Sequence, residues 1–233
     1  MNTFSISEAL AFGWETFKKN VFFLIILVLI MAVANFGVSM VLGVLGDSAP
    51  AVILSNIVSY VITVLVSLGA TKIFIDLVDG KKPSYESLYN QFPLIINFFI
   101  TQVLAGLAIF AGLLLLIIPG IYLAVKLSFA SYLVIDKKLG PIDALKQSYE
   151  ITKGNWWNIV FLGVVSGLIT LAGALALLVG LFVAVPVVML AYAYTYRKLS
   201  GGMGVTPAES APVAPATNPT PAAETAAPAL PQT

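Results

Sequence analysis

Long runs of hydrophobic residues, separated by short polar stretches, make up most of the first 200 positions of the chain. These runs fall at about 21–45, 52–75, 94–118, 121–135, 157–178 and 180–197. A helix needs roughly 20 mainly apolar residues to cross the hydrocarbon core of a bilayer, where it satisfies its own backbone hydrogen bonds. The pattern therefore predicts an all-α polytopic membrane protein whose six transmembrane helices form three hairpins.

The polar stretches before three of these runs resemble one another, which predicts an internal repeat. Residues 7–20, SEALAFGWETFKKN, align without gaps to residues 142–155, IDALKQSYEITKGN, and residues 84–99, SYESLYNQFPLIINFF, are a looser third copy. Apolar positions at helical spacing, with acids early and lysines late, predict an amphipathic helix at the membrane surface for each copy. An ordinary cytoplasmic loop helix is the alternative. The predicted repeat units are about 1–79, 80–137 and 138–199.

The first copy has Ser5 followed by Glu8, which predicts a capping box at the start of its helix. Glu15 with Lys18, and Glu150 with Lys153, have the spacing of solvated ion pairs on a helix. Aromatic rings and lysines favour the headgroup level of a bilayer. The predicted interfacial anchors are Trp14, Tyr149, Trp156, Trp157, Lys18 and Lys153.

Basic residues gather at one end of the predicted hairpins. Eleven of the twelve Lys and Arg residues lie there: Lys18, Lys19, Lys72, Lys81, Lys82, Lys137, Lys138, Lys146, Lys153, Arg197 and Lys198. Excess Lys and Arg in short loops marks the cytoplasmic side of a membrane protein. We therefore expect a multi-pass protein of the cell membrane with both termini in the cytoplasm.

Composition agrees with a membrane protein and narrows the chemistry. The chain is 59% hydrophobic and 10% charged, with a mean hydropathy of +0.98, whereas soluble domains carry roughly 25% charged residues. It has no Cys and no His, which excludes thiol chemistry, disulfides and histidine-based catalysis or metal binding. We expect no catalytic, cofactor-binding or metal site. The expected partners are membrane lipids and a second copy or another membrane protein, but not nucleic acid, because the net charge is only +1.

Residues 200–233 have a different composition, rich in Ala, Pro and Thr. Such a segment buries too little apolar surface to offset its ordering entropy. The sequence predicts a disordered cytoplasmic tail.

One basic residue lies away from the charged end. Lys126 precedes Asp136 by ten residues, about 15 Å of helix, which predicts a mid-membrane position where a lysine costs roughly 2.5–3.5 kcal/mol. It either faces a wet cavity or an anionic group, or it snorkels to the surface. A stripe of hydroxyls on the second run either lines a polar pathway with Lys126 or only packs against a neighbouring helix; its members are Ser55, Ser59, Thr63 and Ser67.

Two small-residue motifs predict close contacts between helices. Gly163 and Gly167 form a GxxxG pair, which lets helix backbones approach closely. Pro119 and Gly120 interrupt the hydrophobic pattern between the third and fourth runs, which predicts a tight turn there.

Residues 112–160 resemble the membrane domain of the glycerophosphoryl diester phosphodiesterase membrane-domain family and its uncharacterised six-helix relatives. The shared features are Pro119-Gly120, the region of Lys126, Gly140-Pro141, Ala144-Leu145, Ser148 and Gly154-Asn155. The resemblance implies a six-helix integral membrane fold. In phosphodiesterase members a separate soluble domain carries hydrolysis, so that activity is not expected of residues 1–199.

Three functions are compatible with these patterns. The first is a non-catalytic protein that organises or shapes the bilayer, or serves as an assembly platform, through its interfacial helices. The second is a transporter or channel for a small solute or lipid with a cavity near Lys126. The third, a lipid-modifying enzyme, lacks a nucleophile–base or metal constellation. The sequence favours the first.

Overall fold

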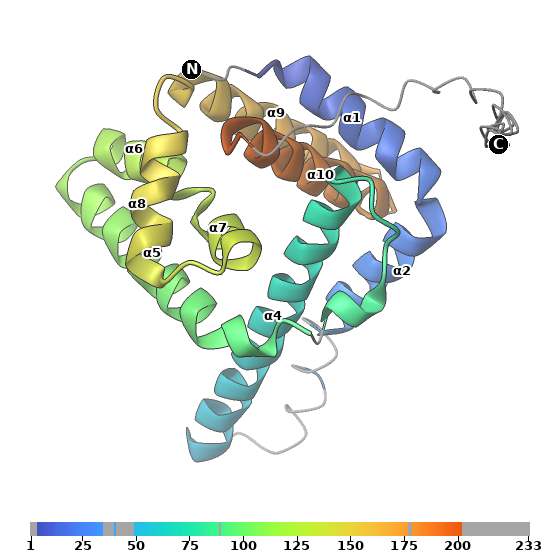
Figure 1. Cartoon of the computed structure of the whole chain (residues 1–233). Coiled ribbons are helices and arrows are strands. Elements are labelled where there is room, and N and C mark those ends of the chain that lie inside the picture. The colour runs from blue at the N-terminus through green and yellow to red at the C-terminus, as the bar shows by residue number, and fades with distance from the viewer. Residues whose placement is uncertain (1–3, 35–39, 41–48, 89, 177–178, 202–233) are drawn as a thin grey trace, which may run out of the picture. The chain divides into compact units, whose positions relative to one another are not determined.

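A computed structural model describes residues 4–34, 40, 49–88, 90–176 and 179–201 (Figure 1). The regular secondary structure of the described residues is all helical, which confirms the all-α prediction. Its α-helices are α1 (Ile6–Lys19), α2 (Val21–Ala32), α4 (Ala49–Val78), α5 (Ile95–Leu115), α6 (Ile117–Leu127), α7 (Ala130–Lys137), α8 (Pro141–Ile151), α9 (Trp156–Leu175) and α10 (Leu181–Leu199). Two 3₁₀ turns, η2 (Tyr85–Leu88) and η3 (Phe92–Leu94), precede α5. The predicted tail lies outside the described residues.

Four segments of the described chain are long and apolar enough to cross a membrane: Val52–Val78, Tyr85–Leu115, Ile117–Lys137 and Trp156–Leu175. The shorter helix α2 is apolar as well. The first predicted run continues into residues 35–48, most of which lie outside the described residues. The last run forms α10, whose final turn carries Arg197 and Lys198. The fold thus agrees with a helical membrane protein, while the six spans in three hairpins stay a prediction.

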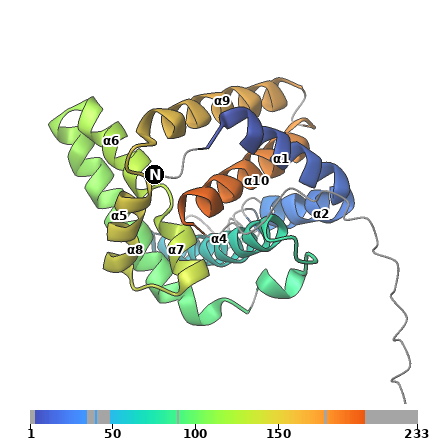
Figure 2. The same cartoon turned by 45° about the horizontal axis from the view of Figure 1, so that its top comes forward.

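Helix α10 is buried along most of its length and contacts α1, α2, α4 and α9 (Figures 1 and 2). Its closest neighbour is α1. A Cβ added to Gly13 of α1 would lie 2.6 Å from the carbonyl oxygen of Val187, so only glycine permits this approach. Ala9 and Phe17 of α1 are buried too. The apolar side of α1 therefore packs on protein, and its polar side is left exposed.

The turn between α5 and α6 is at Leu116, whose backbone is extended. The predicted turn at Pro119-Gly120 is therefore wrong by about one helical turn. Both residues lie in the first turn of α6, where the N–H that proline lacks has no helical acceptor. Gly120 is buried, and a Cβ there would lie 2.4 Å from the side chain of Leu113. Gly120 thus brings α6 close to α5.

The predicted fourth helix is broken. α6 ends at Leu127 and α7 begins at Ala130. The hydroxyl of Ser148 in α8 donates to the carbonyl of Lys126 at 2.8 Å and accepts from the N–H of Phe129 at 3.2 Å. One buried hydroxyl on a neighbouring helix thus satisfies main-chain groups at the break, which the uninterrupted apolar sequence did not reveal.

The repeat copies differ in local structure. The first two contain the helices α1 and α8, but the third forms η2 and η3 instead of the predicted amphipathic helix, because Pro93 lacks an N–H donor and restricts the residue before it. Trp156 and Trp157 begin α9 rather than ending α8, since Gly154 turns the chain with φ of 78°. The capping box is also wrong: Ser5 makes no side-chain cap, and its hydroxyl pairs with that of Ser7.

Each copy nevertheless packs on the helix that ends the preceding predicted repeat unit: η2 packs on α4, and α8 on α6 and α7. The first copy, α1, packs in the same way on α10, which ends the last unit. These contacts include Gly69 with Leu88, Lys126 with Ser148, and Val187 with Gly13. The three helix positions Gly69, Lys126 and Val187 each lie ten residues before Asp79, Asp136 and Arg197, respectively. The same packing register thus recurs three times.

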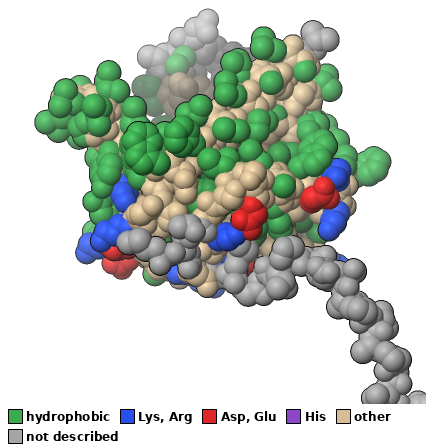
Figure 3. All heavy atoms as spheres, turned by 90° about the horizontal axis from the view of Figure 1, so that it is seen from above, with side chains coloured by type: hydrophobic (Ala, Val, Ile, Leu, Met, Phe, Trp, Pro, Cys, Tyr) green, Lys and Arg blue, Asp and Glu red, His purple; other side chains and the backbone are tan. Residues whose placement is uncertain are grey.

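Large hydrophobic side chains are exposed over much of the molecule. Ile53 is 61% exposed on α4, Leu107 59% on α5, Ile117 70% on α6 and Leu168 60% on α9. Figure 3 shows hydrophobic side chains over much of one face, with charged side chains gathered toward one edge. A soluble monomer rarely exposes so large an apolar surface, whereas a bilayer would cover it.

Candidate functional site

Lys126 lies in the last turn of α6 and is only 4% exposed. Its Nζ is 4.9 Å from the ring centre of Tyr149 and 5.6 Å from that of Tyr122, distances at which an ammonium is attracted to the face of an aromatic ring. The phenolic oxygens of Tyr122 and Tyr149 are 3.1 Å apart and share a hydrogen bond. Lys126 is therefore held between α6 and α8 rather than extended toward solvent.

Tryptophans from the start of α9 extend this arrangement. The Tyr122 and Trp156 rings are 6.3 Å apart, and Trp156 contacts Trp157 edge to face at 4.5 Å. The turn at Gly154 brings both tryptophans to this place immediately after α8 ends. We call Tyr122, Lys126, Tyr149, Trp156 and Trp157 the Lys126 cluster.

A partly open cavity of about 420 Å³ lies beside the Lys126 cluster. Its lining residues are Ile118, Tyr122, Gly154, Trp156, Trp157 and Asn158. The indole Nε1 of Trp156 is buried and has no hydrogen-bond partner within the described part of the chain. An unsatisfied buried donor costs roughly 1–3 kcal/mol, so a tryptophan that lines this cavity has an N–H that nothing in the described protein uses.

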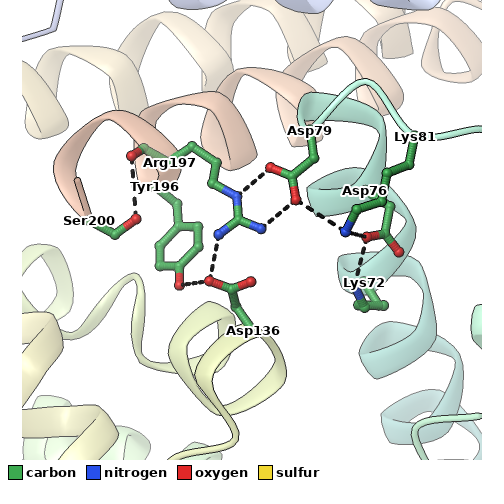
Figure 4. Close-up of polar contacts among 8 residues, drawn as sticks. All are labelled: Lys72, Asp76, Asp79, Lys81, Asp136, Tyr196, Arg197 and Ser200. Atoms are coloured by element: carbon green, nitrogen blue, oxygen red, sulfur yellow. Dashed lines mark hydrogen bonds and ion pairs between the residues drawn. The ribbon is translucent and has the colours of Figure 1, made fainter. Parts of the chain in front are cut away.

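A second polar site joins the ends of α4, α7 and α10 (Figure 4). The Arg197 guanidinium donates to Asp79 through Nε and Nη2, at 2.7 and 2.6 Å, and to Asp136 through Nη1 at 2.6 Å. The hydroxyl of Tyr196 donates to the same Asp136 oxygen at 2.7 Å. These bonds connect three helices through one side chain that is only 11% exposed.

Two lysines and a further carboxylate continue this site. Asp76 accepts from Lys72 at 2.6 Å and from Lys81 at 2.9 Å, and the bond to Asp76 raises the pKa of Lys81. We call this set the Arg197 cluster; its members are Lys72, Asp76, Asp79, Lys81, Asp136, Tyr196 and Arg197. With its groups ionised, three cations face three carboxylates, so the charges balance internally. The Arg197 cluster therefore holds helices together and leaves no charge for a ligand.

The hydroxyl stripe and the Lys126 cluster are separate. Ser55, Ser59, Thr63 and Ser67 lie on α4, whereas the described contacts of the Lys126 side chain are with Tyr122 and Tyr149. Ser55 donates to the carbonyl of Val52, and the carbonyl of Ser67 accepts from Thr71. Such bonds to the preceding turn are typical of hydroxyls that pack within a helix bundle.

The GxxxG pair makes little contact in the described structure. A Cβ at Gly163 would lie 3.5 Å from the Tyr192 hydroxyl, an ordinary contact, and one at Gly167 would meet open space. The close approach between α9 and α10 is further along, where a Cβ at Gly173 would lie 2.9 Å from the carbonyl oxygen of Gly180.

The predicted anchors are divided between exposed and buried positions. Trp14 and Trp157 are 46% and 64% exposed. Lys18 pairs with Glu15 at 2.6 Å and Lys153 with Glu150 at 2.8 Å, both exposed, which confirms the predicted helix pairs. Tyr149 and Trp156 instead turn inward to the Lys126 cluster.

Sequence reasoning missed the Arg197 cluster and the role of Ser148. One signal was present: Asp79 and Asp136 end corresponding helices, and each is soon followed by two lysines, in DGKK and DKK. That similarity marks equivalent helix ends, but nothing in it indicates that Arg197 lies between them.

Helical structure, four long apolar segments and charges gathered at helix ends define a helical membrane protein. Within that class, the chain belongs to a family described as a domain of unknown function (DUF7847), whose sequence model matches residues 93–230, more than half of the chain. The match includes the Lys126 cluster and the Asp136 and Arg197 positions.

Relatives extend the similarity to the N-terminal part of the chain. The uncharacterized protein Rv2560 of Mycobacterium tuberculosis is 28% identical over 237 residues, which cover 90% of this chain and 73% of the relative. The UPF0259 membrane protein PC1_1998 of Pectobacterium carotovorum is 33% identical over 89 residues, 37% of this chain and 36% of the relative. No solved structure matches the chain.

Proposed function

We propose that this chain is a non-catalytic integral membrane protein that organises or shapes the bilayer, or serves there as an assembly platform. The observation that carries the proposal is the apolar tip where α5 turns into α6. Every residue from Leu113 to Ile118 is an exposed leucine or isoleucine, and Leu115 is 77% exposed. An uncharged tip of this kind would be costly in water and is stabilised by acyl chains.

The geometry of this tip favours a wedge. α6 has 11 residues, about 16 Å of helix, and ends at the break, whereas α5 has 21 residues, about the thickness of a hydrocarbon core. Because the segment Ile117–Lys137 is broken between α6 and α7 whereas α5 is continuous, the pair would occupy more area in one leaflet than in the other, which favours curvature. The exposed sides of α1 and α8, which carry Trp14 and lysines, would add area at the headgroup level, while the apolar side of α1 packs on α10.

Full-length protein reconstituted in liposomes tests this function. We expect smaller or tubular vesicles at high protein density, and a reduced effect for Leu115→Ser with Leu116→Ser. A matched control is Leu54→Ser with Ile57→Ser, which changes exposed residues of α4. Vesicles that keep their diameter with wild-type protein would refute bilayer shaping. Extraction of the protein from membranes by alkaline carbonate would refute integral insertion.

We propose a cytoplasmic location for both termini and test it with single cysteines, since the native chain has none. Ser200→Cys should react with an impermeant thiol reagent only in inverted vesicles, and Ser48→Cys only in intact cells. The opposite pattern would reverse the orientation. The resemblance to phosphodiesterase membrane domains supports the insertion of residues 112–160 but carries no catalytic role for this chain.

One observation favours a transporter or channel as the second candidate: the buried Lys126 contacts Tyr122, which lines a cavity. This function requires water to reach Lys126 in the membrane. An impermeant thiol reagent is applied to Lys126→Cys in intact cells and, separately, in inverted vesicles. Labelling in both preparations would support this function, and protection in both would exclude it.

A further inference from the structure

We propose that the cavity beside Lys126 binds the phosphate group of an anionic phospholipid. This inference rests on the proposed insertion of the chain in a bilayer, and it adds a specific lipid site to that function.

The first reason is an ammonium group without a counter-ion. The carboxylates on neighbouring helices are used elsewhere or face outward: Glu150 pairs with Lys153, Asp136 pairs with Arg197, and Asp143 is exposed. Among the described residues, the Lys126 ammonium contacts the rings of Tyr122 and Tyr149, and no salt bridge from it is found there. Aromatic faces offset part of the desolvation of a buried cation, and an anion would offset much more.

The second reason is that the cluster presents donors. The Lys126 ammonium has three N–H groups, and the buried indole N–H of Trp156 has no partner among the described residues. The Tyr122–Tyr149 bond uses one phenolic hydrogen and leaves the other available. A phosphate diester has two anionic oxygens and two ester oxygens, so it can accept from several of these groups at once, with charge-assisted bonds to the ammonium.

The third reason is that the architecture does not require a lysine at this position. The equivalent positions in the other two predicted repeat units, also ten residues before Asp79 and Arg197, are Gly69 and Val187. The contact of Lys126 with Ser148 is made by its backbone carbonyl, which any residue would provide. A buried charge that neither packing nor the repeat demands is better explained by a ligand.

The cavity walls indicate a lipid rather than a soluble phosphate. Ile118 and Trp157 line it and are 76% and 64% exposed. Apolar surface continues from the cavity onto α6 and α9, where Ile117 is 70% and Phe161 52% exposed. Acyl chains can lie along this surface while the headgroup occupies the cavity. The headgroup should carry no cation, because Lys126 would repel it.

The test measures lipid retained by the full-length protein. Wild-type protein is reconstituted in nanodiscs containing equal amounts of phosphatidylglycerol and phosphatidylcholine, released in mild detergent, and analysed by native mass spectrometry. We expect bound phosphatidylglycerol in clear excess. Lys126→Met should reduce its retention by about tenfold or more, and Trp156→Phe, which keeps a ring but removes the N–H, by roughly fivefold. Lys153→Met removes an exposed lysine of the same region and should have no effect.

Equal retention of phosphatidylglycerol by wild type, Lys126→Met and Trp156→Phe would overturn the proposal, as would equal retention of the two lipids by wild type. Displacement of the lipid by millimolar inorganic phosphate or glycerol phosphate would reassign the cavity to a soluble phosphate ester and overturn the lipid assignment. If Lys126→Met fails to fold, Trp156→Phe decides alone. A protein that shapes vesicles but shows no lipid preference refutes this site and leaves the proposed function intact.

Discussion

Replacing Arg197 by methionine should destabilise the protein more than any exposed charge substitution, because two carboxylates share this guanidinium. Breaking a buried ion pair by removing one partner costs roughly 3–5 kcal/mol. Asp79 and Asp136 are 18% and 14% exposed, so water screens them in part, and we expect a loss of about 2–4 kcal/mol in the free energy of unfolding. Arg197→Lys should lose less, since an ammonium keeps the charge but not the forked geometry.

The assay is reversible unfolding in mixed micelles, followed by tryptophan fluorescence. Lys153→Met serves as the control, because its exposed pair with Glu150 contributes about 0–1 kcal/mol. Combining Arg197→Met with Asp79→Asn and Asp136→Asn should recover at least half of the loss, since the triple variant leaves no buried carboxylate uncompensated, and Lys81, which loses its contact with Asp79, is exposed. If Arg197→Met unfolds at the same point as Lys153→Met, the Arg197 cluster does not hold the helix ends together.

Three further predictions follow from particular contacts. Gly13→Ala should lower the melting temperature in detergent because its Cβ would clash with α10, whereas Gly167→Ala, which meets open space, should not; equal melting temperatures would contradict the packing of α1. Ser148→Ala should cost about 1–3 kcal/mol by leaving main-chain groups at the α6–α7 break unsatisfied, and proteolysis at the break should then become faster. The hydrogen bond from Lys198 lowers the pKa of Glu8 below its ordinary 4.5. Near that pH the unfolded chain therefore binds more protons than the folded protein. The stability that Glu8 contributes is fully present above pH 4.5 and is lost as the pH falls through the folded pKa. Glu8→Gln should therefore flatten the stability profile below pH 4.5, and an unchanged acid limb would contradict the contact.

The hydrophobic pattern was sufficient to predict where most helices lie. The run at 94–118 became α5, Ile95–Leu115, and the run at 157–178 became α9, Trp156–Leu175. Such runs are reliable because a continuous apolar segment of this length has few structures other than a helix that satisfy its backbone. The boundary at Pro119 was wrong because proline is compatible with a first helical turn.

The sites depended on contacts that periodicity does not encode. Arg197 bonds to residues 118 and 61 positions earlier, and those pairings exist only because three helix ends meet. Ser148 lies 22 residues from the carbonyl that it binds, and nothing around Lys126 marks the break that this bond bridges. Lys126 itself was identifiable, since one lysine among apolar residues is conspicuous, but of its aromatic neighbours only Tyr122 lies on the same helix, and Tyr149 and Trp156 come from α8 and α9.

The composition of the Arg197 cluster follows from how three helix ends, one from each predicted repeat unit, meet. Corresponding helix ends carry Asp79, Asp136 and Arg197, and they converge on one small volume. Three aspartates there would repel one another, and three arginines would do the same, so identical units could not meet in this way. A single arginine in the third unit turns that repulsion into attraction and uses its forked donors for both partners. The bonds of Arg197 bring the end of α10 to the ends of α4 and α7. Helix α10 also packs on α1, the first described helix of the chain. The third predicted unit therefore supplies the arginine that joins the other two helix ends, and without this departure from the repeat the three ends would repel one another.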